Sequence, residues 1–83
     1  MKIEVTQEDI EQGWPSSTTH CPIALAVKRT LQREVEVYMA SIVLSPASPY
    51  RQRIWVGEIK DFVRDYDAGW PVQPITFDLE IPS

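Results

Sequence analysis

The chain has 83 residues, of which 43% are hydrophobic and 24% charged, and its formal net charge is −4. This length allows one domain at most, and the balance of apolar and charged residues excludes a wholly disordered chain. The acidic net charge argues against general nucleic-acid binding, which needs a surplus of Lys and Arg to neutralise phosphates. We therefore expect residues 1–83 to form a single domain.

Three further features narrow the class of protein. The sequence has no run of about 18 apolar residues, so we expect no membrane association. Residues 1–5 lack the apolar core of a signal peptide. Cys21 is the only cysteine, which excludes an internal disulfide and makes a reducing cytoplasm the expected location.

The first predicted element is a short strand over residues 2–6, where apolar and polar side chains alternate. Thr6 followed by Asp9 resembles a capping box. This pattern predicts one helical turn over residues 7–12, closed by Gly13.

A polar loop over residues 14–20 separates this turn from the first long helix. Pro22 suits the first position of a helix, where its missing N–H is no loss. Ile23, Val27 and Leu31 then recur every four residues, which predicts an amphipathic helix within residues 21–33.

From residue 34 the period changes to two, which predicts one strand over residues 34–44. Its second half is apolar on both faces, as is typical of a covered strand. Two prolines within residues 45–49 turn the chain. Residues 51–56 alternate again and predict a strand paired with the previous one.

Apolar residues at i, i+3, i+4 and i+7 predict a second long helix over residues 59–66. Gly69 is a suitable C-terminal cap, and Pro71 prevents continuation of the helix. Residues 75–81 alternate cleanly and predict a half-buried strand.

The predicted order is β-α-β-β-α-β, so the fold class is α+β. This order is that of a ferredoxin-like or related sandwich, in which two helices cover one face of a mostly antiparallel four-stranded sheet. An alternative arrangement, with the two terminal strands paired at one side, uses the same elements.

One candidate protein-binding surface is the acidic flank of the second long helix. At 100° per residue Glu58, Asp61 and Asp65 fall together, and Lys60 and Arg64 fall on the other flank. Like charges four residues apart, and acids near a helix C-terminus, both oppose the helix. The alternative is an ordinary solvated face. The candidate partner-binding residues are Glu58, Asp61, Asp65, Asp67, Trp14, Trp70 and Leu25.

A nucleic-acid interface is the alternative binding hypothesis. Basic residues interleaved with aromatic ones can hold a single strand by stacking and phosphate contacts, although cross-strand packing explains Tyr50, Arg53 and Trp55 as well. The candidate residues are Lys28, Arg29, Arg33, Arg51 and Arg53.

Catalytic and metal chemistry find little support in the sequence. Cys21 at a helix N-terminus is a candidate nucleophile, but a nucleophile needs an oriented base, and His20 is the only histidine. Structural zinc sites usually need four Cys or His ligands. We expect no catalytic residues, no metal and no cofactor.

Three segments resemble a group of small uncharacterised proteins encoded by bacteriophages and prophages. They are MKIEVTQEDI, CPIALAVKR and FVRDYDAGWPVQPITFDLEI. In that group an opening "I-x-V-T-Q-E-D-I", a "C-P-I-A-L-A" helix and a closing "F-D-A-G-x-P-V-x-P-F-x-F" recur. The chain departs from the pattern at Tyr66 and Ile75, where Phe is usual. The resemblance implies a phage accessory protein in the cytoplasm of a bacterial host, and it carries no catalytic residues.

The leading expectation is therefore a non-enzymatic protein that binds a host or phage macromolecule. In its concrete form it is an inhibitor of a host enzyme or defence complex, with Glu58, Asp61 and Asp65 imitating nucleic-acid phosphates. The alternatives are a nucleic-acid-associated protein, an enzyme dependent on Cys21, and a self-assembling homo-oligomer.

Overall fold

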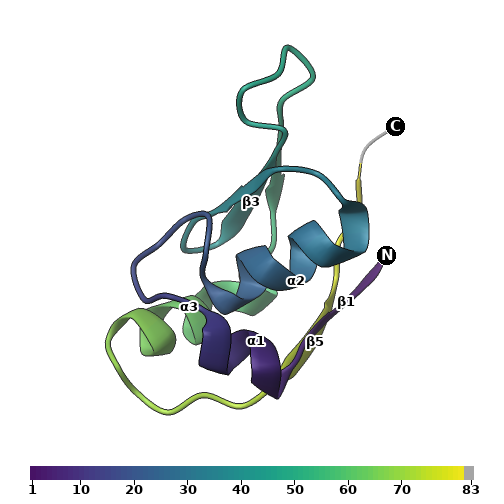
Figure 1. Cartoon of the computed structure of the whole chain (residues 1–83). Helices are drawn as coiled ribbons and strands as arrows, with labels where there is room; N and C mark the ends of the chain where they lie inside the picture. Colours follow the sequence, from purple (N-terminus) through teal and green to yellow (C-terminus); the bar gives the residue numbers. More distant parts are fainter. Residues whose placement is uncertain (82–83) are drawn as a thin grey trace.

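The structure is a computed structural model that describes residues 1–81 (Figure 1). Its elements follow one another as β1 (Lys2–Val5), α1 (Gln7–Gln12), α2 (Pro22–Leu31), β2 (Val35–Val37), β3 (Ser41–Leu44), β4 (Gln52–Trp55), the 3-10 helix η1 (Gly57–Ile59), α3 (Lys60–Asp67) and β5 (Ile75–Asp78). The predicted α+β class is confirmed.

The strands form two separate antiparallel sheets. The terminal strands β1 and β5 pair with each other, with Ile3 opposite Phe77. A second sheet has the order β2-β3-β4. The prediction of one four-stranded ferredoxin-like sheet is therefore wrong, and the alternative with paired terminal strands describes β1 and β5 correctly.

The prediction of one strand over residues 34–44 is also wrong, because the chain turns back between β2 and β3. The Tyr38 N–H donates to the Ser41 carbonyl at 2.8 Å, which closes the hairpin. Val35 lies opposite Leu44, and both are buried. All four residues of β3 are buried, so the prediction that this part of the segment is covered on both faces is confirmed. The predicted pairing of β4 with the strand before it is confirmed.

The N-terminal capping box is present as predicted. The Thr6 hydroxyl accepts from the Asp9 N–H at 3.2 Å, and the Asp9 carboxylate accepts from the Thr6 N–H at 2.9 Å. Gly13 ends α1 in an extended conformation rather than a left-handed one. A Cβ at Gly13 would lie 2.6 Å from the Pro22 Cδ, so the glycine allows α1 to turn closely onto the start of α2.

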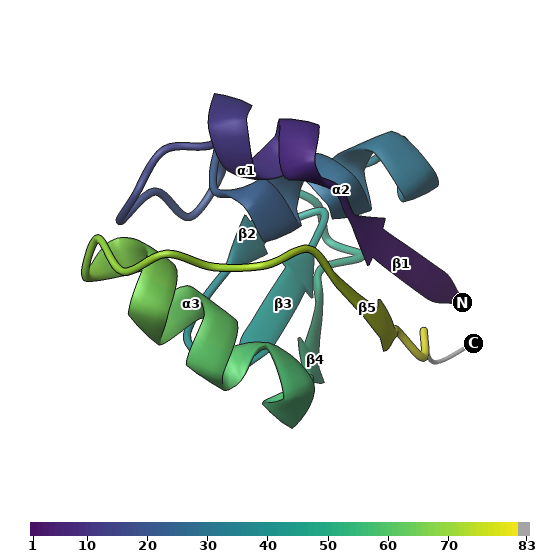
Figure 2. The ribbon, with the colours of Figure 1, turned by 90° about the horizontal axis from the view of Figure 1, so that it is seen from below.

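Helix α2 joins the two sheets, since it packs against both β1 and β2. Figure 2 shows α1 and α2 on one side of the molecule, α3 on the other, and the segment before β5 crossing between them. One core cluster contains buried residues of both sheets, α2, η1 and α3. Ile3, Ile23, Ile42 and Ile59 are among them. Within residues 1–81 no helix is long and apolar enough to cross a membrane.

Helix α3 begins and ends close to where the sequence predicts. Phe62 and Val63 face the core, and η1 precedes the helix. Gly69 adopts a left-handed conformation with φ of 85°, and its N–H donates to the Tyr66 carbonyl at 3.1 Å. This glycine cap fixes the point at which the chain leaves α3 toward β5.

Candidate functional site

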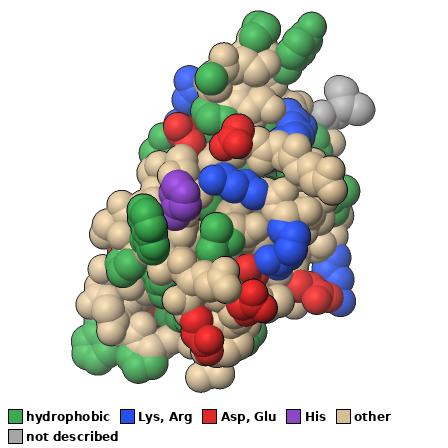
Figure 3. Space-filling model, viewed as in Figure 1, with side chains coloured by type: hydrophobic (Ala, Val, Ile, Leu, Met, Phe, Trp, Pro, Cys, Tyr) green, Lys and Arg blue, Asp and Glu red, His purple; other side chains and the backbone are tan. Residues whose placement is uncertain are grey.

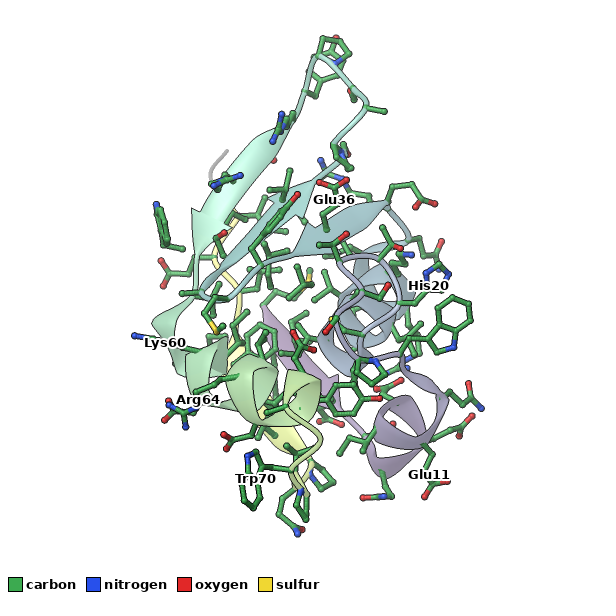
Figure 4. All side chains as sticks on the ribbon, turned by 90° about the vertical axis from the view of Figure 1, so that its left-hand side faces the viewer. Glu11, His20, Glu36, Lys60, Arg64 and Trp70 are labelled. Carbon is green, nitrogen blue, oxygen red and sulfur yellow. The ribbon has the colours of Figure 1, made fainter. Side chains whose placement is uncertain are left out.

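An apolar hollow of about 260 Å³ opens at the surface of the described chain. Its walls come from residues 16–18, residues 21–23, residues 37–39 and four side chains of α3: Phe62, Val63, Tyr66 and Asp67. Figure 4 views this side of the molecule, with Lys60 and Arg64 pointing away from the loop that carries His20. We call this hollow the α3 pocket.

The loop at residues 14–20 forms one wall because hydrogen bonds hold it against two other elements. The Ser16 N–H donates to the Asp67 carboxylate at 2.8 Å, although the two residues are 51 positions apart. The Val37 N–H, at the outer edge of β2, donates to the Thr18 carbonyl at 2.8 Å. Asp67, predicted as a partner-binding residue, thus positions the pocket wall and also lines the pocket.

The chemistry of the pocket walls is mainly apolar and aromatic. Phe62 and Tyr66 stack with ring centroids 6.1 Å apart. The Tyr66 hydroxyl donates to the Ile10 carbonyl at 3.1 Å, so its polar end is already satisfied. Asp67 is the single charged residue among those that line the pocket. Such a site favours an apolar group, and it favours a cation over an anion beside that group.

The lip of the α3 pocket is the turn between β2 and β3. Tyr38 and Met39 lie there with 38% and 47% of their surface exposed, and both line the pocket. Sequence reasoning missed this site because Met39 belonged to a predicted continuous strand. The alternation gave no signal of the turn, because β3 is buried at all four positions and Val43 continues the apolar side of Val35 and Val37.

Cys21 lies in the pocket wall as the N-cap of α2. Its sulfur accepts from the Ala24 N–H at 3.4 Å, and the residue is buried. Burial raises the pKa of the Cys21 thiol above its ordinary value, which is the opposite of what a thiolate nucleophile requires.

His20 does not approach this thiol to complete a nucleophile–base pair. Its ring stacks on Trp14 with centroids 4.8 Å apart, and its Nδ1 lies 2.8 Å from the Thr19 hydroxyl. Figure 3 shows His20 at the surface beside a hydrophobic side chain. His20 and Cys21, although adjacent in the sequence, therefore lie in different surroundings.

The predicted acidic flank is real, but an arginine partly neutralises it. Glu58, Asp61 and Asp65 line one shallow groove beside the segment before β5. Arg64 Nη1 lies 3.2 Å from Asp61 Oδ1, and Arg64 Nε lies 3.1 Å from Asp65 Oδ1. Sequence geometry placed Arg64 on the opposite flank, yet its long side chain spans the distance.

The other predicted partner-binding residues lie apart from one another. Trp14 and Trp70 are 61% and 67% exposed, so neither folds back over the core. Leu25 is half-buried on α2. Trp14 belongs to the loop that forms one wall of the α3 pocket and stacks on His20 within it, whereas Trp70 follows the C-terminal cap of α3.

Three of the five basic candidates make bonds within the molecule. Lys28 Nζ donates to the Thr19 carbonyl at 2.6 Å, Arg29 pairs with Asp9, and Arg33 donates to the Ser45 hydroxyl at 2.9 Å. These bonds position the polypeptide chain and engage some of the donors that a phosphate would need.

Arg51 directly precedes β4 and Arg53 lies within it, and both are exposed. The Arg53 guanidinium lies 5.4 Å from the centroid of the Tyr38 ring, a cation–π contact on the outer face of the sheet. Trp55 and Tyr50 are 74% and 79% exposed, so the predicted cross-strand packing does not bury them.

Metal ligands do not converge in the part of the chain that the structure describes: no three His, Cys, Asp or Glu side chains form a group that could hold an ion. Comparison with family models, with curated proteins and with solved structures finds no match to this chain.

Proposed function

We propose that this chain is a non-enzymatic accessory protein that binds a protein partner, and that the α3 pocket receives an apolar side chain of that partner. The observation that supports this most directly is an apolar hollow whose lip carries the exposed Tyr38 and Met39. Interface hot spots lie in such pockets, where an anchor side chain is fully desolvated.

The size of the pocket suits a single side chain. At about 260 Å³ it lies at the lower edge of the ~300–1,000 Å³ typical of small-molecule sites. Two polar groups from α3 line the pocket: the Tyr66 hydroxyl donates to the backbone, and Asp67 accepts from the Ser16 N–H and keeps acceptor sites for a cation. A single anchor residue on a protein surface suits these dimensions and this chemistry.

The resemblance to phage-encoded proteins supports a host or phage protein as the partner, bound in the bacterial cytoplasm. A small binding protein inhibits its target by covering a functional surface. We propose this role for the chain, with a host enzyme or defence complex as the target. Acidic mimicry by α3 is a weaker basis for it, because Arg64 pairs with Asp61 and Asp65.

Capture from a bacterial lysate with three immobilised proteins tests the proposal. Met39→Glu places a charge at the pocket lip, and Trp55→Glu is the matched control because it changes an exposed residue outside the pocket. We expect one protein to be retained by wild type and Trp55→Glu and lost with Met39→Glu. Equal retention by all three, or no specific retention, contradicts the proposal.

The outer face of the three-stranded sheet favours a second candidate, binding of single-stranded nucleic acid. Arg53, Trp55 and the Tyr38 ring are exposed there, and base stacking on aromatic rings contributes about 1–3 kcal/mol per base. For this function Trp55→Glu abolishes a salt-dependent gel shift, and Met39→Glu does not. A flat titration at low salt removes this candidate.

A further inference from the structure

The β3–β4 loop, residues 45–51, extends beyond the rest of the molecule (Figure 1). Near its end Tyr50 is 79% exposed, the largest exposed fraction among the large hydrophobic residues of the described chain. Figure 3 shows hydrophobic side chains gathered at the tip. Arg51 follows directly and is also exposed. The loop therefore presents an aromatic ring and a neighbouring cation to solvent.

Two successive turns give this loop a fixed shape. The Ser48 N–H donates to the Ser45 carbonyl at 3.0 Å, and the Arg51 N–H donates to the Ser48 carbonyl at 3.1 Å. Pro46 and Pro49 occupy the second position of the two turns, where the proline ring fixes φ. A loop that is already ordered loses little conformational entropy when it binds.

The α3 pocket complements this loop in shape and charge. The loop tip is convex and apolar with a cation beside it, and the pocket is concave and apolar with one anion, Asp67, in its wall. The loop points away from α3 in Figures 1 and 4, and Tyr50 is not among the residues that line the pocket of its own molecule. A second copy of the chain can supply it.

We propose that the α3 pocket of one copy binds Tyr50 of a second copy, with Arg51 facing Asp67. This inference rests on the proposed function, since it names an occupant for the same pocket. Loop and pocket are different surfaces, so the contact is heterologous and each pair retains one free loop and one free pocket. Copies therefore add head to tail, and assembly withdraws the pocket from other partners.

Sedimentation equilibrium up to about 1 mM protein tests this, because a contact made by one anchor residue is weak. We expect the mass of the wild type to rise with concentration beyond that of a dimer. Tyr50→Ser, which removes the anchor, and Met39→Glu, which blocks the pocket, each remain at 9.5 kDa. Trp55→Ser removes a similarly exposed aromatic residue outside both surfaces, and this variant assembles like the wild type.

An equimolar mixture of the two defective variants is the sharpest test. Tyr50→Ser retains a pocket and Met39→Glu retains a loop, so we expect a 1:1 dimer of the mixture that grows no further. Circular dichroism checks the fold of each variant. If Met39→Glu does not fold, the comparison of Tyr50→Ser with the wild type decides the test.

A wild type that is monomeric throughout, oligomers that persist in both variants, or a mixture without dimer would each overturn the inference. None of these outcomes shows whether the same pocket binds another protein. Self-association and partner binding are therefore contradicted by different results.

Discussion

Arg29 holds both carboxylate oxygens of Asp9, with Nη1 2.6 Å from Oδ1 and Nη2 2.9 Å from Oδ2. Asp9 is buried, and the same carboxylate accepts from the Thr6 N–H. Arg29 Nη2 also donates to the Glu4 carbonyl at 3.1 Å. One ion pair thus joins the end of β1, the cap of α1 and the last turn of α2.

Substitution of Asp9 should therefore destabilise the packing of β1, α1 and α2 against one another. Asp9→Ala loses the cap and two charge-assisted hydrogen bonds, and we expect the free energy of unfolding to fall by about 2–4 kcal/mol. Urea denaturation measures this change. Arg64→Ala is the matched control, since it breaks ion pairs at the surface and should leave the midpoint almost unchanged. Equal midpoints for Asp9→Ala and wild type would show that the pair does not stabilise the fold.

The same carboxylate should make stability depend on pH. Burial raises the pKa of Asp9, but hydrogen bonds from Arg29 and Thr6 outweigh it and hold the pKa below the ordinary value of 3.8. A group with a lowered pKa in the folded chain stabilises the fold when it is ionised, so this contribution is present above about pH 5 and is lost as the pH falls through the folded-state pKa. Between about pH 6 and about pH 2, we expect the free energy of unfolding to fall less for Asp9→Asn than for the wild type. Parallel losses in the two proteins would contradict this assignment.

The sequence could predict features whose signals are local. Thr6 and Asp9 are three residues apart, so the capping box was visible, and so was the helix that contains Phe62 and Val63. The partner of Asp9 was not, because Arg29 lies 20 positions away. Any of eight Lys and Arg residues could have supplied that cation.

The separation of the strands into two sheets could not be read from alternation alone. Alternation shows which side of a strand is buried, whereas the neighbour of a strand depends on packing across the core. The α3 pocket was hidden for a similar reason, since its walls come from four segments between residues 16 and 67. Side chains such as Phe62 and Tyr66 belong to the apolar stripe of a helix whether they pack in a core or line an open hollow.

The contact between Gly13 and Pro22 gives a prediction about close packing. A Cβ at residue 13 would lie 2.8 Å from the backbone N of Pro22, which cannot move without shifting α2. We expect Gly13→Ala to lower the free energy of unfolding by about 1–3 kcal/mol. Gly57→Ala is the matched control, because a Cβ there meets nothing within 4 Å and restricts only the unfolded chain. Thermal unfolding compares the two, and equal melting temperatures would mean that the junction of α1 and α2 relaxes freely.

Cys21 offers the final prediction, which bears on the enzyme alternative. Burial raises the pKa of its thiol, and the sulfur accepts from the Ala24 N–H as an N-cap. At neutral pH the native protein should therefore react with an alkylating reagent at least about tenfold more slowly than the urea-unfolded chain. Cys21→Ser keeps a capping acceptor and should retain the fold, since serine is a preferred N-cap residue. Labelling that is faster in the native protein than in urea would instead identify an activated thiolate. It would support the alternative of an enzyme that depends on Cys21 in the wall of the α3 pocket.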